Sequence, residues 1–479
     1  MPLAPALKSR EFAIVTGLAF LAFFAQLKDF QLLFDGLTYF SLSKNILTTG
    51  DWQVLHYSPE QYTDFYQHPP LAIWLQAWVI RLFGDAEWVA RILPSTFALG
   101  TVWVGFLFLA RHYTIQTAFW FSIVLITSTR YLKWGTNFYL DGIMGFFIWA
   151  GVLSWLAWMR STRAYWLAGL SGALLALALM TKGVVALAGV AGVGLAAAWM
   201  VMMSPKEYAL PRVFTGLLAF LAGILLPLLI WGQGFGGWSY IEYYLKLSVA
   251  DRVRTSPSPE GWIHPWRNIY SLWLPWWPLA LGTLFASLRS WDRFKQSREM
   301  WCLALIGLMF PVGLGFGSIY LEHYLTPFYP FAAFVAAIGM ERITRNQYPR
   351  ALKGFSVLTL LVAFALATIA PAVHVAKDTP VVRLISEIRT LSPKLQDGIS
   401  TVAVSQPAAE IWSAIATIQG KTRYRALGNF DPKRSPPPNT VLLLKKQETP
   451  SVAWTPVPCL WVDDHRIYFS PDLQIPCRD

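Results

Sequence analysis

Three ionisable residues beside strongly apolar segments are the first candidates for chemistry. Asp35 follows the apolar run QLLF, Asp141 opens a long apolar segment, and Lys182 stands between the apolar runs LLALALM and GVVALAGVAG. A charge at membrane depth costs on the order of 2.5 to 3.5 kcal/mol at a helix centre, so such residues are functional candidates. A carboxylate can accept the proton of an attacking hydroxyl, and an ammonium can neutralise a phosphate. Structural roles also stay open, because Asp35 could cap a helix beginning near Thr38, and Asp141 suits the first turn of a helix.

The partner of Lys182 is open on sequence grounds. No acidic residue lies near it along the chain, so its ammonium needs either a distant carboxylate or a bound phosphate. We favour the phosphate.

Two further segments carry polar groups that could bind substrate. In the first, Pro69 and Pro70 follow His68 and fix an extended entry to a helix, which would hold the imidazole rigidly. In the second, His323 and Tyr324 occupy a tight turn before a Pro-interrupted apolar segment. These residues and Lys133 are predicted to contact a lipid phosphate or a sugar.

A metal site has little support. The four residues His68, His264, Glu322 and His323 could in principle ligate a metal ion, but no ligand spacing such as His-x-x-x-His is present. We therefore predict neither a metal nor another cofactor.

The composition indicates a polytopic helical membrane protein. Hydrophobic residues make up 55% of the 479 residues and charged residues only 14%, far below the share in soluble domains. The 24 Trp residues suit interfacial belts at both membrane surfaces. A net charge of +12 could suggest a nucleic-acid partner, but the Lys and Arg residues are spread through short loops, which is typical of cytoplasmic loops instead.

About eleven segments are long and apolar enough to be predicted as membrane spans. The first is expected to be an uncleaved span rather than a signal peptide, because no cleavage site and soluble domain follow it. The predicted spans are 12–34, 90–110, 114–129, 141–159, 164–181, 183–203, 213–232, 270–288, 300–319, 324–341 and 354–372. A twelfth segment, Pro69 to Phe83, is short and is predicted to be an amphipathic helix in the outer interface, with Trp74 and Trp78 one turn apart.

The distribution of positive charge fixes the predicted topology. If Pro69 to Phe83 does not cross, the Lys and Arg of the short loops concentrate on the side of the N-terminus, which is then cytoplasmic. All the candidate residues above then lie at the outer face. The predicted domains are a transmembrane catalytic domain, 1–372, with a first outer loop, 35–89, and a small extracytoplasmic α/β domain, 373–479.

The C-terminal region has the pattern of a soluble domain. The runs TVAVS and TVLLLKK predict strands, and about 105 residues suffice for a small core. Cys459 and Cys477 could form a disulfide there or remain free thiols.

At this point the order and spacing of the motifs resemble a known family over roughly residues 10 to 340. Asp35, the His-Pro-Pro-Leu run, LFGDAEWVARILPS, Asp141, Thr181-Lys182-Gly183 and the segment from His323 to Pro330 are similar to those of bacterial protein O-mannosyltransferase-like enzymes. That family includes the aminoarabinose transferases and belongs to the GT-C class of integral-membrane glycosyltransferases.

The resemblance implies a function and roles for the candidates. The enzyme is expected to move a sugar from a polyprenyl-phosphate donor to lipid A, another glycan or a protein, inverting the anomeric centre at the outer face of the bacterial inner membrane. Asp35 corresponds to the acid of the first outer loop, acting as base or organiser of the acceptor, and Asp141 to the second outer-loop acid. His68 corresponds to a Lys or His before Pro-Pro, and Lys182 to the Lys-Gly near the lipid phosphate. Relatives often have a second acid after the first Asp, where this chain has Gly36.

A transporter or flippase for a lipid-linked saccharide is the alternative. That class predicts polar residues along a path through the bilayer and repeat symmetry between halves. The candidates here gather at one predicted face, which favours catalysis.

Overall fold

The computed structural model describes most of the first 347 residues and parts of the C-terminal region. Its described residues are 3–28, 32, 34–57, 65–161, 164–203, 210–246, 259–274, 276–289, 292, 294, 297–315, 321–347, 385, 388, 399, 401–404, 418, 425–428, 433, 437–445, 455–462 and 465–469. The predicted span 354–372 therefore lies outside the described residues.

The chain divides into two compact units. Unit 1 comprises Met1–Asp29, Tyr66–Ala72 and Arg91–His374, and unit 2 comprises Phe30–Phe65, Ile73–Ala90 and Val375–Asp479. The elements of each unit are given separately below.

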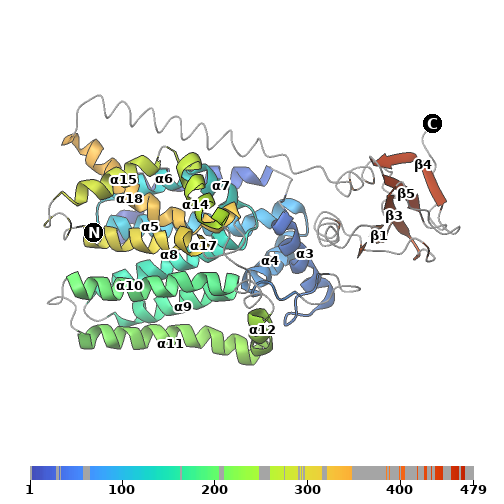
Figure 1. Cartoon of the computed structure of the whole chain (residues 1–479), viewed down its shortest axis with the longest axis horizontal. Coiled ribbons are helices and arrows are strands. Elements are labelled where there is room, and N and C mark those ends of the chain that lie inside the picture. The colour runs from blue at the N-terminus through green and yellow to red at the C-terminus, as the bar shows by residue number, and fades with distance from the viewer. Residues whose placement is uncertain are drawn as a thin grey trace. The chain divides into compact units, whose positions relative to one another are not determined.

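Unit 1 is a bundle of helices (Figure 1). Its α-helices are α1 (Leu3–Leu7), α2 (Arg10–Phe24), α5 (Ile92–His112), α6 (Ile115–Ile126), α7 (Thr129–Thr136), α8 (Leu140–Met159), α9 (Tyr165–Lys182), α10 (Leu187–Met203), α11 (Leu210–Gly234), α12 (Gly237–Tyr244), α14 (Pro259–Leu272), α15 (Trp276–Ser287), α17 (Arg298–Gly315) and α18 (Phe328–Arg342). Short 3-10 segments η1 (Ala25–Lys28), η3 (Gly183–Ala186) and η5 (Glu322–Leu325) and the π-helical segment η6 (Ile343–Gln347) adjoin them.

Close backbone contact holds the long helices together. Helices α8 and α11 both pack against α9, and Figure 1 shows these helices roughly parallel. A Cβ at Gly172 of α9 would lie 2.0 Å from the carbonyl oxygen of Phe220, and one at Gly223 of α11 would lie 2.0 Å from that of Gly169. Small residues at these crossings let apolar helices approach without side chains between them. The core of unit 1 includes fully buried Trp149 and Trp155 on α8.

Five described stretches are long and apolar enough to cross a membrane. They are Glu87–His112, Leu140–Met159, Tyr165–Met203, Leu210–Gly234 and Arg298–Gly315. Tyr165–Met203 is a 39-residue run that contains two of the predicted spans, α9 and α10. Helices also lie in the predicted spans that contain α6, α15 and α18, but these are shorter. The protein is thus mostly helical with several membrane-capable helices, and the count of eleven stays a prediction.

The first predicted span, 12–34, is longer than the helix found there. Helix α2 ends at Phe24 and η1 at Lys28, and a new helix begins at Phe34 instead of near Thr38. The charged pair Lys28 and Asp29 interrupts the apolar run, because both groups favour water over hydrocarbon.

Unit 2 combines helices from the N-terminal half with a C-terminal sheet. Its helices are α3 (Phe34–Thr49), α4 (Leu71–Phe83, from Ile73 onward) and the 3-10 segment η2 (Glu87–Arg91, up to Ala90). The buried Ser43 hydroxyl of α3 donates to the Ile73 carbonyl of α4 at 3.1 Å. Trp74 of α4 donates its indole N–H to the carbonyl of Trp52 at 2.9 Å, and Trp78 is half exposed. The helix expected over 69–83 is therefore present, with a polar contact through Trp74.

The sheet has five strands in the order β2-β1-β3-β5-β4. The strands are β1 (Thr401–Val404), β2 (Arg425–Gly428), β3 (Thr440–Lys445), β4 (Thr455–Val462) and β5 (His465–Phe469). Strand β1 pairs in parallel with β2 and β3, whereas β5 pairs antiparallel with β3 and β4. Strands β1 and β3 are the runs TVAV and TVLLLK, in which Val402, Ala403, Val441, Leu442 and Leu443 are buried. The pairing of Cys459 and Cys477 lies outside what the structure describes.

Candidate active site

A short helix and a sharp turn bring Asp141 into the interior of unit 1. Helix α7 ends at Thr136, Asn137 and Tyr139 are extended, and α8 begins at Leu140. This places Asp141 in the first turn of α8, where the macrodipole stabilises a carboxylate. The Asp141 side chain is fully buried.

Lys182 is the ion-pair partner of Asp141. Its Nζ contacts Asp141 Oδ2, and only 2% of the Lys182 side chain is exposed. Of the two partners that the sequence left open, the structure shows the distant carboxylate, and contact of Lys182 with a phosphate stays a prediction. The pair could not be read from the sequence because the two residues are 41 positions apart and meet only through the packing of α8 on α9.

The residue after Lys182 must be glycine. Gly183 ends α9 with φ +67°, in the left-handed region that favours glycine. A Cβ there would also lie 2.1 Å from the hydroxyl of Tyr244, which accepts a hydrogen bond of 3.0 Å from the Val184 amide. The motif Thr181-Lys182-Gly183 thus turns the chain directly after its buried cation.

The segment η5 adds an imidazole and a phenol to the ion pair. His323 Nε2 lies 3.7 Å from Asp141 Oδ2, and Lys182 Nζ lies 4.3 Å from the centre of the Tyr324 ring. His323 lies between membrane-capable helices, and burial, with the charges of Lys182 and His68, holds the pKa of its imidazole far below its usual range. His323 is therefore neutral at physiological pH.

Aromatic rings close the other side of His323. The rings of Tyr139 and Trp134 lie 4.4 and 5.5 Å from the imidazole, centroid to centroid. Trp134 Nε1 is buried, and among the described residues it has no hydrogen-bond acceptor. An unused indole donor beside a neutral imidazole suits an acceptor oxygen of a ligand. Sequence reasoning did not single out Trp134 or Tyr139, although both flank the GTNF turn before Asp141.

Lys133 adds a second cation on α7. Its Nζ lies 4.2 Å from the centre of the Trp134 ring. Burial, together with the positive charge of Arg130, lowers the pKa of Lys133 to about 8. Arg130 in turn forms a 2.6 Å ion pair with Glu322, so α7 is linked to η5 next to the candidate site.

His68 also belongs to this surrounding. It is buried, its charge influences His323, and its carbonyl accepts a 2.6 Å hydrogen bond from the hydroxyl of Tyr240. The ring of Tyr66 stacks on Tyr243 at 4.9 Å. The rigid placement expected for His68 therefore has a visible cause in α12.

Asp35 is described with unit 2. It lies half-buried in the first turn of α3, not at the end of the first span as predicted. Its negative charge acts on Tyr57: burial first, and then Asp35, raises the pKa of that phenol above its usual value. The structure thus gathers Asp141, Lys182, His323, Tyr324, Lys133 and His68 in unit 1, and it gives Asp35 a phenolic neighbour in unit 2.

The described residues offer no evident metal site. Among them, no group of three or more His, Cys, Asp or Glu side chains is arranged to hold an ion. The candidate site described above consists of a buried ion pair, a neutral imidazole, two phenols and an indole.

Comparison with known proteins gives a family match and related sequences. Residues 67–231 match the family described as dolichyl-phosphate-mannose-protein mannosyltransferase. An undecaprenyl phosphate-alpha-4-amino-4-deoxy-L-arabinose arabinosyl transferase of Yersinia pestis is 25% identical over 366 residues, covering 72% of this chain. The same-named protein of Erwinia tasmaniensis is 26% identical over 64% of this chain. The chain spans 62% of the length of the Yersinia relative and 55% of the Erwinia one.

Solved structures share the fold over nearly the whole chain. ArnT from Cupriavidus metallidurans bound to undecaprenyl phosphate matches with a TM-score of 0.69 at 14% identity, over 97% of this chain and 99% of that one. The archaeal oligosaccharyltransferase AglB from Archaeoglobus fulgidus matches with a TM-score of 0.54 at 11% identity, over 91% and 69%. The fold match extends beyond the part of the chain that carried the sequence resemblance. The protein is thus a multi-pass membrane protein with the GT-C fold, and its resemblance to the bacterial protein O-mannosyltransferase-like family, which includes the aminoarabinose transferases, is confirmed.

Proposed function

We propose that this protein is a glycosyltransferase that moves a sugar from a polyprenyl-phosphate donor to lipid A, another glycan or a protein. The observation that carries the proposal is the buried cluster of Asp141, Lys182 and His323. The family match at 67–231 includes two of these three residues. The names of the curated relatives support an undecaprenyl phosphate carrier.

Lys182 and Lys133 are proposed to stabilise the negative charge of the leaving phosphate. Transfer breaks the bond between the anomeric carbon and the phosphate oxygen, so negative charge develops on the polyprenyl phosphate that departs. A preformed cation in a water-poor site stabilises such charge far more than a solvated one. Asp141 holds the Lys182 side chain in place, and the neutral His323 and the indole of Trp134 can donate hydrogen bonds to phosphate or sugar oxygens. Tyr324 orients the Lys182 ammonium through its ring face.

Asp35 is proposed as the base. The acceptor hydroxyl attacks the anomeric carbon from the side opposite to the phosphate, which inverts that centre, and its proton passes to the Asp35 carboxylate. Tyr57, whose phenol stays protonated, is the described neighbour that could orient this carboxylate. His68, buried and anchored through Tyr240, is proposed to line the donor site.

The proposal includes a location and a division of the chain. The protein is placed in the bacterial inner membrane with a cytoplasmic N-terminus. Residues 1–372 form the catalytic membrane domain with the outer loop 35–89, and residues 373–479 form an extracytoplasmic domain. The amphipathic helix Pro69 to Phe83 lies on the outer surface. Cysteine labelling at position 81, an exposed position of this helix, tests this topology, and access from the cytoplasmic side would overturn it.

Sugar transfer in isolated membranes tests the function. A radiolabelled polyprenyl-phosphate sugar is supplied with the wild type, Asp35→Ala and Lys182→Ala, and label in the acceptor fraction is measured over time. We expect both substitutions to reduce transfer, while Arg289→Gln, an exposed cation outside the cluster, keeps it. Full transfer by Asp35→Ala would remove its role as base. Movement of intact donor across the membrane without transfer would instead indicate the flippase alternative.

A further inference from the structure

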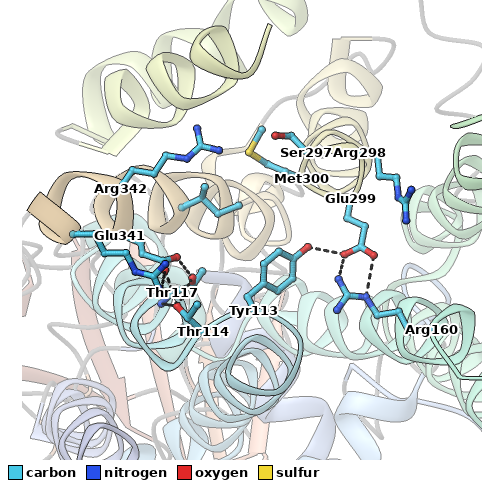
Figure 2. Close-up of a pocket in the computed structure, with 12 residues that line it drawn as sticks. Tyr113, Thr114, Thr117, Arg160, Ser297, Arg298, Glu299, Met300, Glu341 and Arg342 are labelled. Carbon is cyan, nitrogen blue, oxygen red and sulfur yellow. Dashed lines mark hydrogen bonds and ion pairs between the residues drawn. The ribbon is translucent and has the colours of Figure 1, made fainter. Parts of the chain in front are cut away.

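A large polar cavity lies at the other end of α8 from Asp141. Its volume is about 780 Å³, and it is lined by Tyr113, Thr114, Thr117, Arg160, Ser297, Arg298, Glu299, Met300, Ile338, Glu341, Arg342 and Arg345 (Figure 2). Arg160 is the C-cap residue of α8, whereas Asp141 lies in the first turn of that helix. A helix of this length spans about 30 Å, roughly the thickness of the hydrocarbon core. The cavity is thus separate from the candidate active site.

The cavity carries an excess of positive charge. Four guanidinium groups, from Arg160, Arg298, Arg342 and Arg345, line it together with only two carboxylates, from Glu299 and Glu341. Arginine is the residue best suited to phosphate, because its planar guanidinium presents paired donors to two oxygens.

Hydrogen bonds fix both carboxylates in the wall. Arg160 forms a two-pronged ion pair with Glu299, which also accepts a 2.7 Å hydrogen bond from the hydroxyl of Tyr113. Burial, and then the negative charge of Glu299, raises the pKa of Tyr113, so its hydroxyl remains a donor. These contacts hold Glu299, in the first turn of α17, in the wall of the cavity.

The second carboxylate is fixed in the same way. Glu341 accepts hydrogen bonds from Thr114, at 2.9 Å, and from Thr117, and it pairs with Arg345 at 2.8 Å. Figure 2 shows the Glu299 and Glu341 clusters on separate sides of the cavity, with Arg342 extending over the space between them. Among the described residues Arg342 has no ion-pair partner. Arg345 is half exposed, so the cavity opens to solvent at its edge.

We propose that this cavity binds a phosphate-bearing ligand at the face of the membrane opposite to the proposed active site. Arg342, helped by Arg298 and Arg345, contacts the phosphate, while the glutamates organise the wall and restrict the site to ligands with few negative charges. A phospholipid headgroup and a small soluble phosphate share this chemistry. The volume lies in the range typical of small-ligand sites.

Binding to the purified full-length protein in neutral detergent tests the proposal. The shift in unfolding temperature is titrated with short-chain phosphatidylglycerol and, in a separate arm, with inorganic phosphate; short-chain phosphatidylcholine serves as the zwitterionic control. We expect at least one anionic probe to stabilise the protein, with an effect that weakens as salt is added. Response to phosphatidylglycerol alone identifies a lipid headgroup, and response to inorganic phosphate alone identifies a soluble phosphate.

Substitutions connect the response to this cavity. Arg342→Gln should weaken the apparent affinity roughly tenfold, because a charge-assisted hydrogen bond to phosphate is lost, and Arg342→Lys should recover part of it. The matched control Arg289→Gln removes an exposed arginine outside the cavity and should leave the affinity unchanged. Unfolding without probe identifies variants that fail to fold, in which case Arg345→Gln, at the exposed edge, replaces Arg342→Gln. No stabilisation by either anion, or equal stabilisation of all variants, would overturn the proposal.

Discussion

The two ends of helix α8 solve the same electrostatic problem in opposite ways. At its first turn Asp141 is fully buried and meets a single lysine that is 2% exposed, within a shell of aromatic rings. At its C-terminal cap Arg160, about a quarter exposed, joins a network of arginines, glutamates and hydroxyls around an open cavity. Each charge of a desolvated pair is stabilised mainly by the other charge, whereas in a network near water several groups and the solvent stabilise each charge. The first arrangement suits a site that must hold one charge in place, and the second suits a site that exchanges ligands with solvent.

The largest effect is expected where one member of the buried pair is removed. Lys182→Met leaves the Asp141 carboxylate buried without its cation, and breaking such a pair costs about 3–5 kcal/mol of stability. Sugar transfer should fall by roughly a hundredfold or more, as for loss of a preorganised electrostatic donor. The measurements are the unfolding temperature in detergent and transfer from a labelled donor.

The double variant Lys182→Met/Asp141→Asn is the matched control. It removes both charges and should recover much of the lost stability without restoring transfer. Additive losses of stability in the double variant would show that the two side chains do not act as a pair.

A backbone change next to the pair should have the second largest effect. Gly183→Ala forces a Cβ against the hydroxyl of Tyr244 in a backbone conformation with φ +67°. We expect a loss of about 1–3 kcal/mol, since strained backbone and overpacking each cost that order. The readout is the unfolding temperature of the variant. Combining it with Tyr244→Phe should restore only part of the loss, because the backbone term remains; complete recovery would contradict that term.

The network at the far end of α8 should tolerate a comparable change better. Glu299→Gln keeps a hydrogen-bond acceptor for Arg160 and Tyr113 but removes the charge, and we expect a loss of about 1 kcal/mol. Transfer activity should be unchanged. A loss as large as that of Lys182→Met would erase the distinction between the two ends, so both variants belong in one set of unfolding measurements.

The smallest effect concerns the pH dependence of Lys133. Its pKa is lowered to about 8 by burial and Arg130, so the charged form is disfavoured in the folded protein. This penalty on stability is present below pH 8 and is relieved as the pH rises from about 8 toward the usual lysine value of 10.5. Its attraction for phosphate fades as the pH rises through about 8.

Polyprenyl phosphate affinity should therefore weaken by roughly threefold between pH 7 and pH 9. Lys133→Arg, which stays charged throughout, should abolish this dependence. The quantity to measure is the dissociation constant in detergent at fixed ionic strength. A dependence that survives in Lys133→Arg would assign the titration to another group.

Much of this protein follows from local sequence. Apolar length and the scarcity of charge predict a multi-pass helical protein, and the helices that contain Asp141 and Lys182 begin and end within a residue or two of the predicted bounds. The strands TVAV and TVLLLK were predictable as short apolar runs within a polar region. The end of the first helix was misjudged because Lys28 and Asp29 were counted as part of an apolar run.

The sequence by itself determined which charged residues are costly to bury, and so named Asp35, Asp141 and Lys182 as candidates, because the free energy of desolvating a charge depends on the residue and its immediate apolar neighbours. Only the tertiary structure decided which of these residues contact one another. Packing of the helices paired Lys182 with Asp141 and set the rings of Tyr139 and Trp134 against His323. It also brought arginines from the ends of α8, α17 and α18, and from η6, around one cavity. Such contacts join residues tens to hundreds of positions apart, and their geometry depends on how helices cross, which no local pattern records.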